Sequence, residues 1–89
     1  MQNNLGYLHN KGDYWDSYPI YGTVKIINES IVPEVKGEVA FTYRTPDDDK
    51  VVKKEVPYTP NNYIEETTSG NPIVKITNIK NVRIHIIEL

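Results

Sequence analysis

Three side chains near the start of the chain have the types that bind metal ions. His9, Asp13 and Asp16 form the pattern H-x3-D-x2-D, and imidazole nitrogen with carboxylate oxygens can hold zinc or another divalent cation. The pattern matches no strong metal-binding signature. Aspartates beside Gly12 and Ser17 are typical of turns, because their side chains bond to the local backbone. We therefore expect Asp13 and Asp16 to form turns, and we expect no metal site.

Residues suited to nucleophilic catalysis are scarce. The chain has no cysteine, and its serines lie in segments with turn composition: Ser17, Ser30 and Ser69. None of them stands in the Gly-x-Ser-x-Gly elbow of hydrolases. His85 lies between two isoleucines of a strand-like segment, which is more typical of a sheet-face histidine than of a catalytic base. We expect no catalytic residue, no cofactor and no enzymatic activity; a hydrolase that uses His9 with Asp13 or Asp16 is the enzymatic alternative.

Neighbouring carboxylates occur twice more, and neither group has the spacing of a known site. Asp47, Asp48 and Asp49 offer oxygen ligands to calcium, but the spacing of an EF-hand loop is absent. Glu65 and Glu66 would point to opposite faces of a strand, so they do not form the facing pair of a glycosidase. We expect the three aspartates to lie at a solvated hairpin tip.

Five of the nine aromatic side chains lie within residues 7–21, in and around the stretch GDYWDSYPIYG. Tyrosine and tryptophan bring rigid contact area with a polar group attached, and they are frequent in binding hot spots. In a small domain without disulfides they also stabilise the core. We expect Trp15 to be buried, with Tyr14 and Tyr18 on the opposite face. The candidate partner-binding residues are Tyr7, Tyr14, Trp15, Tyr18, Tyr21, Tyr58 and Tyr63.

Charge and hydropathy argue against several function classes. The formal net charge is −2 and acids and bases are interspersed along the chain, whereas a nucleic-acid partner calls for a basic stripe. No segment approaches the ~18 apolar residues of a membrane span. The first residues lack the basic start and apolar run of a signal peptide. We expect no nucleic-acid partner, no membrane span and a cytoplasmic location, or the host cell or virion if a phage encodes the protein.

Composition and period indicate an all-β chain. Isoleucine, valine and threonine occur eleven, nine and seven times, whereas alanine occurs once, and branched side chains suit a pleated sheet. Alternation of apolar and polar residues predicts strands between turn signals: residues 20–28, 35–44, 51–56, 63–67, 73–79 and 82–89. The charged segment 50–56 is expected at a sheet edge. This segment or the C-terminal strand is expected to accept a partner strand.

Six to seven short strands with turns at this spacing are typical of a small antiparallel β-sandwich of immunoglobulin-like character, with a small β-barrel as the alternative. The Cys…Trp…Cys framework of immunoglobulin domains is absent, because the chain has no cysteine. The 89 residues suffice for one domain. We expect residues 20–89 to form it and residues 1–19 to pack on it as an aromatic and polar segment.

Size, scarcity of catalytic groups and the aromatic-rich start together favour a protein–protein interaction module. An inhibitor of phage or mobile-element type, an immunity protein or a structural protein would fit. The alternative is a carbohydrate-binding or cell-surface sandwich, which predicts exposed, coplanar rings among its aromatic residues. The sequence does not predict the oligomeric state.

Overall fold

The structure is a computed structural model that describes residues 2–32, 34–58 and 62–89. All regular elements in these residues are strands, so the all-β expectation is confirmed. The eight strands are β1 (Asn3–Leu8), β2 (Tyr14–Trp15), β3 (Thr23–Asn28), β4 (Gly37–Arg44), β5 (Asp49–Val56), β6 (Tyr63–Thr67), β7 (Ile73–Asn78) and β8 (Ile84–Glu88).

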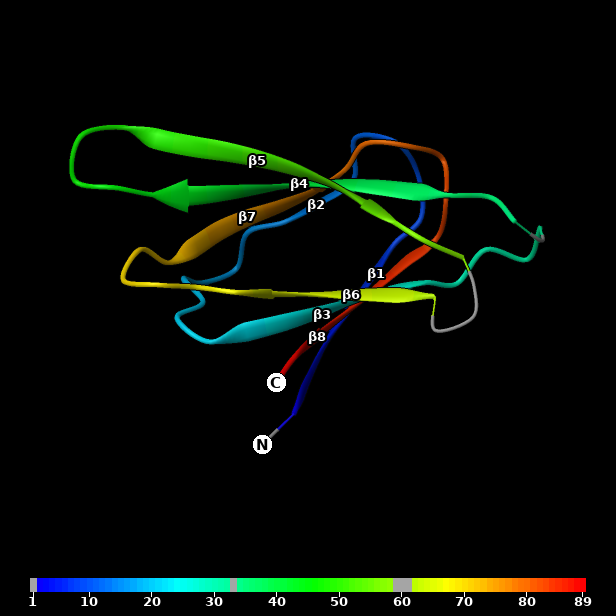
Figure 1. Cartoon of the computed structure of the whole chain (residues 1–89), viewed down its shortest axis with the longest axis horizontal. Coiled ribbons are helices and arrows are strands. Elements are labelled where there is room, and N and C mark those ends of the chain that lie inside the picture. The colour runs from blue at the N-terminus through cyan, green and yellow to red at the C-terminus, as the bar shows by residue number, and fades with distance from the viewer. Residues whose placement is uncertain (1, 33, 59–61) are drawn as a thin grey trace.

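The strands form two antiparallel sheets of four strands each, which lie one above the other (Figure 1). Sheet A has the order β1-β8-β3-β6, and sheet B has the order β2-β7-β4-β5. The two sheets stay separate, so the molecule is a small β-sandwich and the barrel alternative is wrong. The strand count of six to seven is also wrong, because residues 1–19 contribute two further strands.

The pairing follows one simple rule along the chain. β4 pairs with β5, β3 with β6, β2 with β7 and β1 with β8, as in one long hairpin whose tip lies at residues 45–48. Rolling such a hairpin into two sheets gives the eight-strand jelly roll. An immunoglobulin sandwich instead places its strands in the order ABED and CFG, with the first strand beside the second. The expected immunoglobulin-like arrangement is therefore not found.

The two strands that the sequence did not predict are short or irregular. β2 has only two residues, too few to show a period. In β1 the register shifts between Asn4 and Gly6, and Gly6 has a positive φ of 97°. Such a bulge suits glycine and breaks the alternation of the side chains. Both strands are held by pairing with β7 and β8 rather than by their own pattern.

The core lies between the sheets and takes alternate residues from the longer strands. In β3 every second residue is buried, and in β4 the inward-facing Val39 and Phe41 are fully buried. Trp15 is 9% exposed and belongs to the same cluster, which confirms the expectation that it is buried. The core cluster comprises Leu8, Trp15, Ile20, Val24, Ile26, Val39, Phe41, Val56, Ile73, Ile76, Val82, Ile84 and Ile86.

Two buried asparagines close the end of the core where β3 and β7 finish. The Asn28 amide donates to the carbonyl oxygens of Val35 (2.7 Å) and Val56 (3.3 Å) and accepts from the Ser30 backbone N–H (2.9 Å). The Asn78 amide donates in the same way to Leu8 and Val82. Buried carbonyl groups that leave the strand ladders need such partners.

The edge strands lie on two sides of the sandwich. On one side, β6 is the edge of sheet A and β5 is the edge of sheet B. On the other side, β1 is the edge of sheet A and β2 is the edge of sheet B. The expected edge position of residues 50–56 is confirmed, and the lysines of β5 are of the kind that discourages foreign pairing. The C-terminal strand β8 lies between β1 and β3. It therefore offers no free edge, and that expectation is wrong.

Candidate interaction surface

The outer face of sheet A carries a row of four side chains that crosses all four strands. Tyr7 of β1 pairs with His85 of β8. His85 also pairs with Ile27 of β3, which in turn pairs with Tyr63 of β6. Because the neighbouring Ile26 is fully buried, Ile27 and the whole row face outward. We call the following residues the sheet A face: Tyr7, Lys25, Ile27, Tyr63, Arg83, His85 and Ile87.

A cation covers the aromatic ring at each end of this row. The Lys25 ammonium lies 4.2 Å from the ring centroid of Tyr63, and the Arg83 guanidinium carbon lies 4.6 Å from that of Tyr7. Within the described residues, neither cation has a carboxylate oxygen within 4.0 Å, although Glu65 is opposite Lys25 in register. The face therefore presents an apolar centre flanked by two cations, with Glu65 opposite Lys25 in register and Glu29 lining the same cavity as Arg83.

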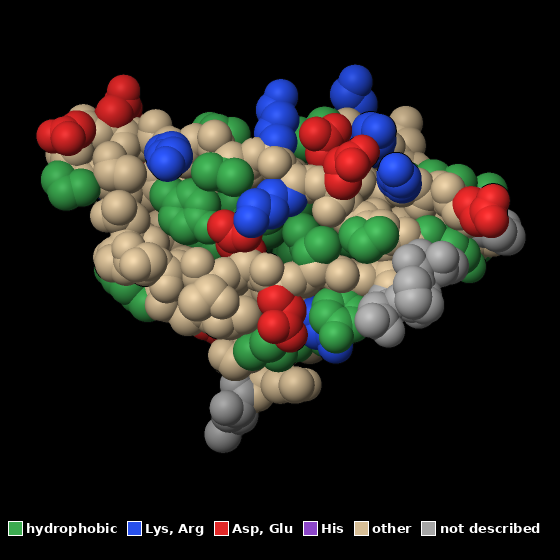
Figure 2. Space-filling model, in the orientation of Figure 1, with side chains coloured by type: hydrophobic (Ala, Val, Ile, Leu, Met, Phe, Trp, Pro, Cys, Tyr) green, Lys and Arg blue, Asp and Glu red, His purple; other side chains and the backbone are tan. Residues whose placement is uncertain are grey.

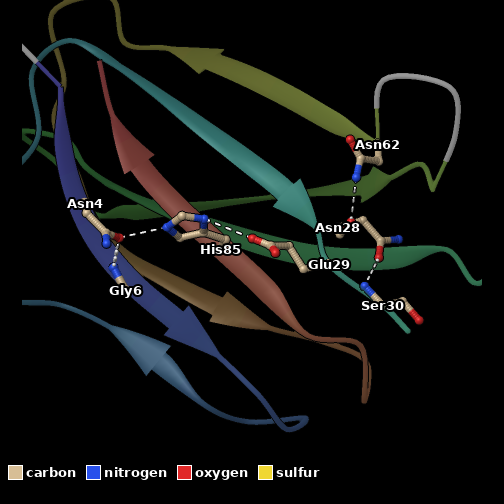
Figure 3. Close-up of polar contacts among 7 residues, drawn as sticks. All are labelled: Asn4, Gly6, Asn28, Glu29, Ser30, Asn62 and His85. Atoms are coloured by element: carbon tan, nitrogen blue, oxygen red, sulfur yellow. Dashed lines mark hydrogen bonds and ion pairs between the residues drawn. The ribbon is translucent and has the colours of Figure 1, made fainter. Parts of the chain in front are cut away.

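His85 ties the centre of the face to two neighbouring segments. Its ring lies parallel to that of Tyr7, with centroids 4.2 Å apart. Nδ1 lies 3.1 Å from Glu29 Oε2, and Nε2 lies 2.8 Å from Asn4 Oδ1 (Figure 3). The Gly6 backbone N–H donates to the same Asn4 oxygen at 3.0 Å. Both ring nitrogens thus have partners in the structure, and these fix the orientation of the imidazole on the face.

A cavity of about 270 Å³ adjoins the sheet A face at the end of the sandwich. Ile31 and Val32 border it with 91% and 55% of their surfaces exposed. The Ser30 hydroxyl fixes this turn because it donates to the Val32 carbonyl oxygen and accepts from the Val32 N–H, both at 3.1 Å. The cavity is lined by His9, Glu29, Ser30, Ile31, Val32, Asn81, Val82 and Arg83. It extends the apolar area of the face.

The aromatic residues between positions 14 and 21 do not form one surface. Tyr14 lies on the outer face of sheet B under the ammonium of Lys75. Tyr18 packs edge-on against Trp15, with ring planes 87° apart, because β2 ends at Trp15 and the alternation does not continue. Tyr18 therefore lies beside Trp15, and the expected separation of the two onto opposite faces is wrong. Tyr21 is 68% exposed in the β2–β3 connection.

Tyr18 also has a polar partner near the C-terminus. Its hydroxyl donates to Glu88 Oε1 at 2.8 Å. This hydrogen bond, with desolvation and the negative charge of Glu88, raises the pKa of Tyr18 above its ordinary value. Tyr58 lies half-buried just after β5, away from the paired strands. Of the seven candidate aromatics, the structure brings Tyr7 and Tyr63 together on the sheet A face.

The predicted turn around Asp13 is present. Asp13 Oδ2 accepts from the backbone N–H groups of His9 (3.0 Å) and Asn10 (2.8 Å). The Asp13 carboxylate therefore stabilises the turn through its hydrogen bonds to the backbone. The end cavity that His9 borders is lined by neither Asp13 nor Asp16. Across residues 2–32, 34–58 and 62–89, no group of three histidine or acidic side chains is placed to hold a metal ion.

Comparison with known proteins gives no relative: no protein-family model, curated protein or solved structure matches the chain. In the part of the chain that the structure describes, no helix is long and apolar enough to cross a membrane.

Sequence reasoning missed Ile27, Arg83 and His85 as members of a surface. Each looked like an ordinary strand residue, and only the register places them beside Tyr7 and Tyr63. One signal was available: isoleucines follow one another at positions 26–27 and 86–87. A doubled apolar residue in a strand puts one side chain on the outer face.

Proposed function

We propose that this chain is a non-enzymatic protein–protein interaction module that binds its partner through the sheet A face. The observation that carries the proposal is the register row from Tyr7 to Tyr63, with its aromatic ends and its apolar centre at Ile27. Tyrosine and arginine are enriched at interfaces, where a buried apolar centre is surrounded by polar groups. An inhibitor, an immunity protein and a structural protein would all use such a face.

Two further observations support this choice. Ile31 and Val32, which are 91% and 55% exposed, form adjacent apolar surface at the border of the end cavity, and contiguous exposed apolar surface is typical of interaction sites. The cations Lys25 and Arg83 lie over the rings of Tyr63 and Tyr7, so the aromatic ends of the face also carry polar groups.

A sugar-binding platform on the predicted aromatic residues has less support. Such a platform needs exposed rings in one plane, but Trp15 is buried and stands nearly perpendicular to Tyr18. Tyr14 and Tyr63 lie on the outer faces of different sheets. The geometry therefore favours a protein partner at the sheet A face.

The chain offers a matched pair of variants for testing the proposal. Tyr63 and Tyr14 are both strand tyrosines that lie under a lysine, but on opposite outer faces. The tagged protein is used to capture its partner from a lysate of the source organism, and captured proteins are identified by mass spectrometry. We expect Tyr63→Ala to lose a protein that the wild type and Tyr14→Ala both retain. Retention by Tyr63→Ala, or loss by Tyr14→Ala instead, contradicts the proposal.

A further inference from the structure

A second cavity, of about 250 Å³, lies between the two sheets at the end opposite the first cavity. In Figure 1 this is the end where the β4–β5 hairpin and the β6–β7 connection lie above one another. Arg44 N–H donates to the Pro72 carbonyl oxygen at 3.0 Å and holds the two connections together. The cavity is lined by Tyr43, Thr45, Lys50, Val52, Glu66, Thr67, Ser69 and Asn71.

Glu66 is held in a fixed position at this cavity. Its Oε1 lies 2.7 Å from the Lys54 ammonium, and its Oε2 accepts from the Tyr43 hydroxyl. The side chain of Glu66 is only 12% exposed. A carboxylate has about four lone-pair positions, so two remain for hydroxyl groups of a ligand. Figure 2 shows this side of the molecule, where acidic and basic side chains adjoin apolar ones between the sheets.

The lining combines polar groups and apolar surface that suit a small ligand with several hydroxyl groups. Glu66 is neutralised by Lys54, so Lys50 is the remaining charged donor of the lining. The hydroxyl groups of Tyr43, Thr45 and Thr67 already have partners in Glu66, Asp48 and Thr23. The Ser69 hydroxyl and the Asn71 amide offer both donors and acceptors. The Tyr43 ring and Val52 supply apolar surface for carbon-bound hydrogens. The volume is below the ~300–1,000 Å³ of pockets for drug-sized ligands, so the ligand is small.

We propose that this cavity binds one six-membered sugar ring, either as a free monosaccharide or as the end residue of a glycan. A sugar ring combines hydroxyl groups on its rim with apolar C–H faces, and the cavity combines the complementary groups. A peptide strand fits less well, because the Lys54–Glu66 ion pair joins the two sheets and interrupts the space between β5 and β6. The residues that line this cavity are not part of the sheet A face. The sugar-binding proposal and the protein-binding proposal can therefore be refuted independently.

The test is a titration of the ¹⁵N-labelled protein followed by amide chemical shifts. The probes are glucose, galactose, mannose and N-acetylglucosamine, with the open-chain polyol sorbitol as control. A glycan array read with the same protein distinguishes a glycan end from a free sugar. We expect one of the sugars to shift amides within residues 43–52 and 66–71, with a dissociation constant in the millimolar range.

Lys50 and Lys53 provide the matched variants for this test. Both are exposed on β5, but Lys50 borders the cavity whereas Lys53 pairs with Ala40 on the outer face of sheet B. Losing a charged hydrogen-bond donor is expected to weaken binding about tenfold in Lys50→Ala and to leave Lys53→Ala unchanged. The amide spectra themselves show that both variants are folded. The proposal is overturned if no sugar or glycan shifts these amides, if sorbitol shifts them equally, or if both variants bind alike.

Discussion

The ring of Tyr7 and the imidazole of His85 lie parallel across β1 and β8, with planes 13° apart and centroids separated by 4.2 Å. The Arg83 guanidinium lies over the Tyr7 ring, and the His85 ring is hydrogen-bonded to Glu29 and Asn4. The stacked rings and the His85–Asn4 hydrogen bond hold the edge strand β1 against β8, and they form one half of the sheet A face. They tie the stability of β1 to the surface that we propose for binding.

Replacing His85 by alanine is expected to loosen β1. The variant loses two hydrogen bonds and the stacked ring, at a cost of about 1–3 kcal/mol in the free energy of unfolding. Hydrogen exchange of residues 3–8 is expected to accelerate more than that of β4. Ile87→Ala, on the same strand and face, is the control because its side chain makes no hydrogen bond. Unchanged exchange in residues 3–8 would show that the His85 contacts do not hold β1.

Asn28 is expected to be among the most costly polar residues to replace. The Asn28→Ala variant leaves two carbonyl groups and the Ser30 N–H without their partner. Unpaired buried groups cost ~1–3 kcal/mol each, so we expect a loss of at least about 2 kcal/mol in urea-induced unfolding. Asn3→Ala, at an exposed position, should change the midpoint little. Equal effects of the two variants would refute a structural role for Asn28.

The single tryptophan reports on the core. Since Trp15 is 9% exposed, its fluorescence in the folded protein is expected to be blue-shifted relative to the unfolded chain. Trp15→Ala should destabilise the fold by about 3–5 kcal/mol. Sugars that shift the amides of the second cavity should leave the emission unchanged, because Trp15 does not line that cavity. An emission maximum typical of exposed tryptophan would contradict the packing.

Stability is expected to fall at alkaline pH through Tyr43. Burial, with the hydrogen bond and the charge of Glu66, raises the pKa of Tyr43 above the ordinary 10.0. The unfolded chain therefore loses this proton at lower pH than the folded protein, so the stability contribution is complete below pH 10 and is lost as the pH rises further. In Tyr43→Phe the free energy of unfolding should fall less steeply above pH 10. An identical slope in both proteins would exclude this coupling.

Part of the fold was predictable because local pattern determines it. β4 alternates apolar and polar residues over its whole length, and β6 was predicted with the bounds that the structure has, at Tyr63–Thr67. β1 and β2 depend on partners distant in the chain, since β1 pairs with β8 and β2 with β7. No local pattern reveals such pairing, and strand order depends on it.

The candidate surface was predictable only in its residue types. Tyr7 and Tyr63 were singled out as aromatic residues, yet they are 56 positions apart and share a face, at its two opposite edges, only through a four-strand register. A shift of one residue in that register would turn every second side chain inward. Tyr43 lies within the predicted strand 35–44, but its contact with Glu66 across the two sheets has no counterpart in sequence spacing.

Binding through the sheet A face is tested most directly by photo-crosslinking from within that face. A photoreactive phenylalanine analogue is placed at position 63, and in a control protein at position 14, in cells of the source organism. We predict one covalent adduct from position 63 that excess unmodified protein suppresses, and none from position 14. An adduct from position 14 alone, or no adduct from position 63, would contradict the assignment of the sheet A face as the binding surface.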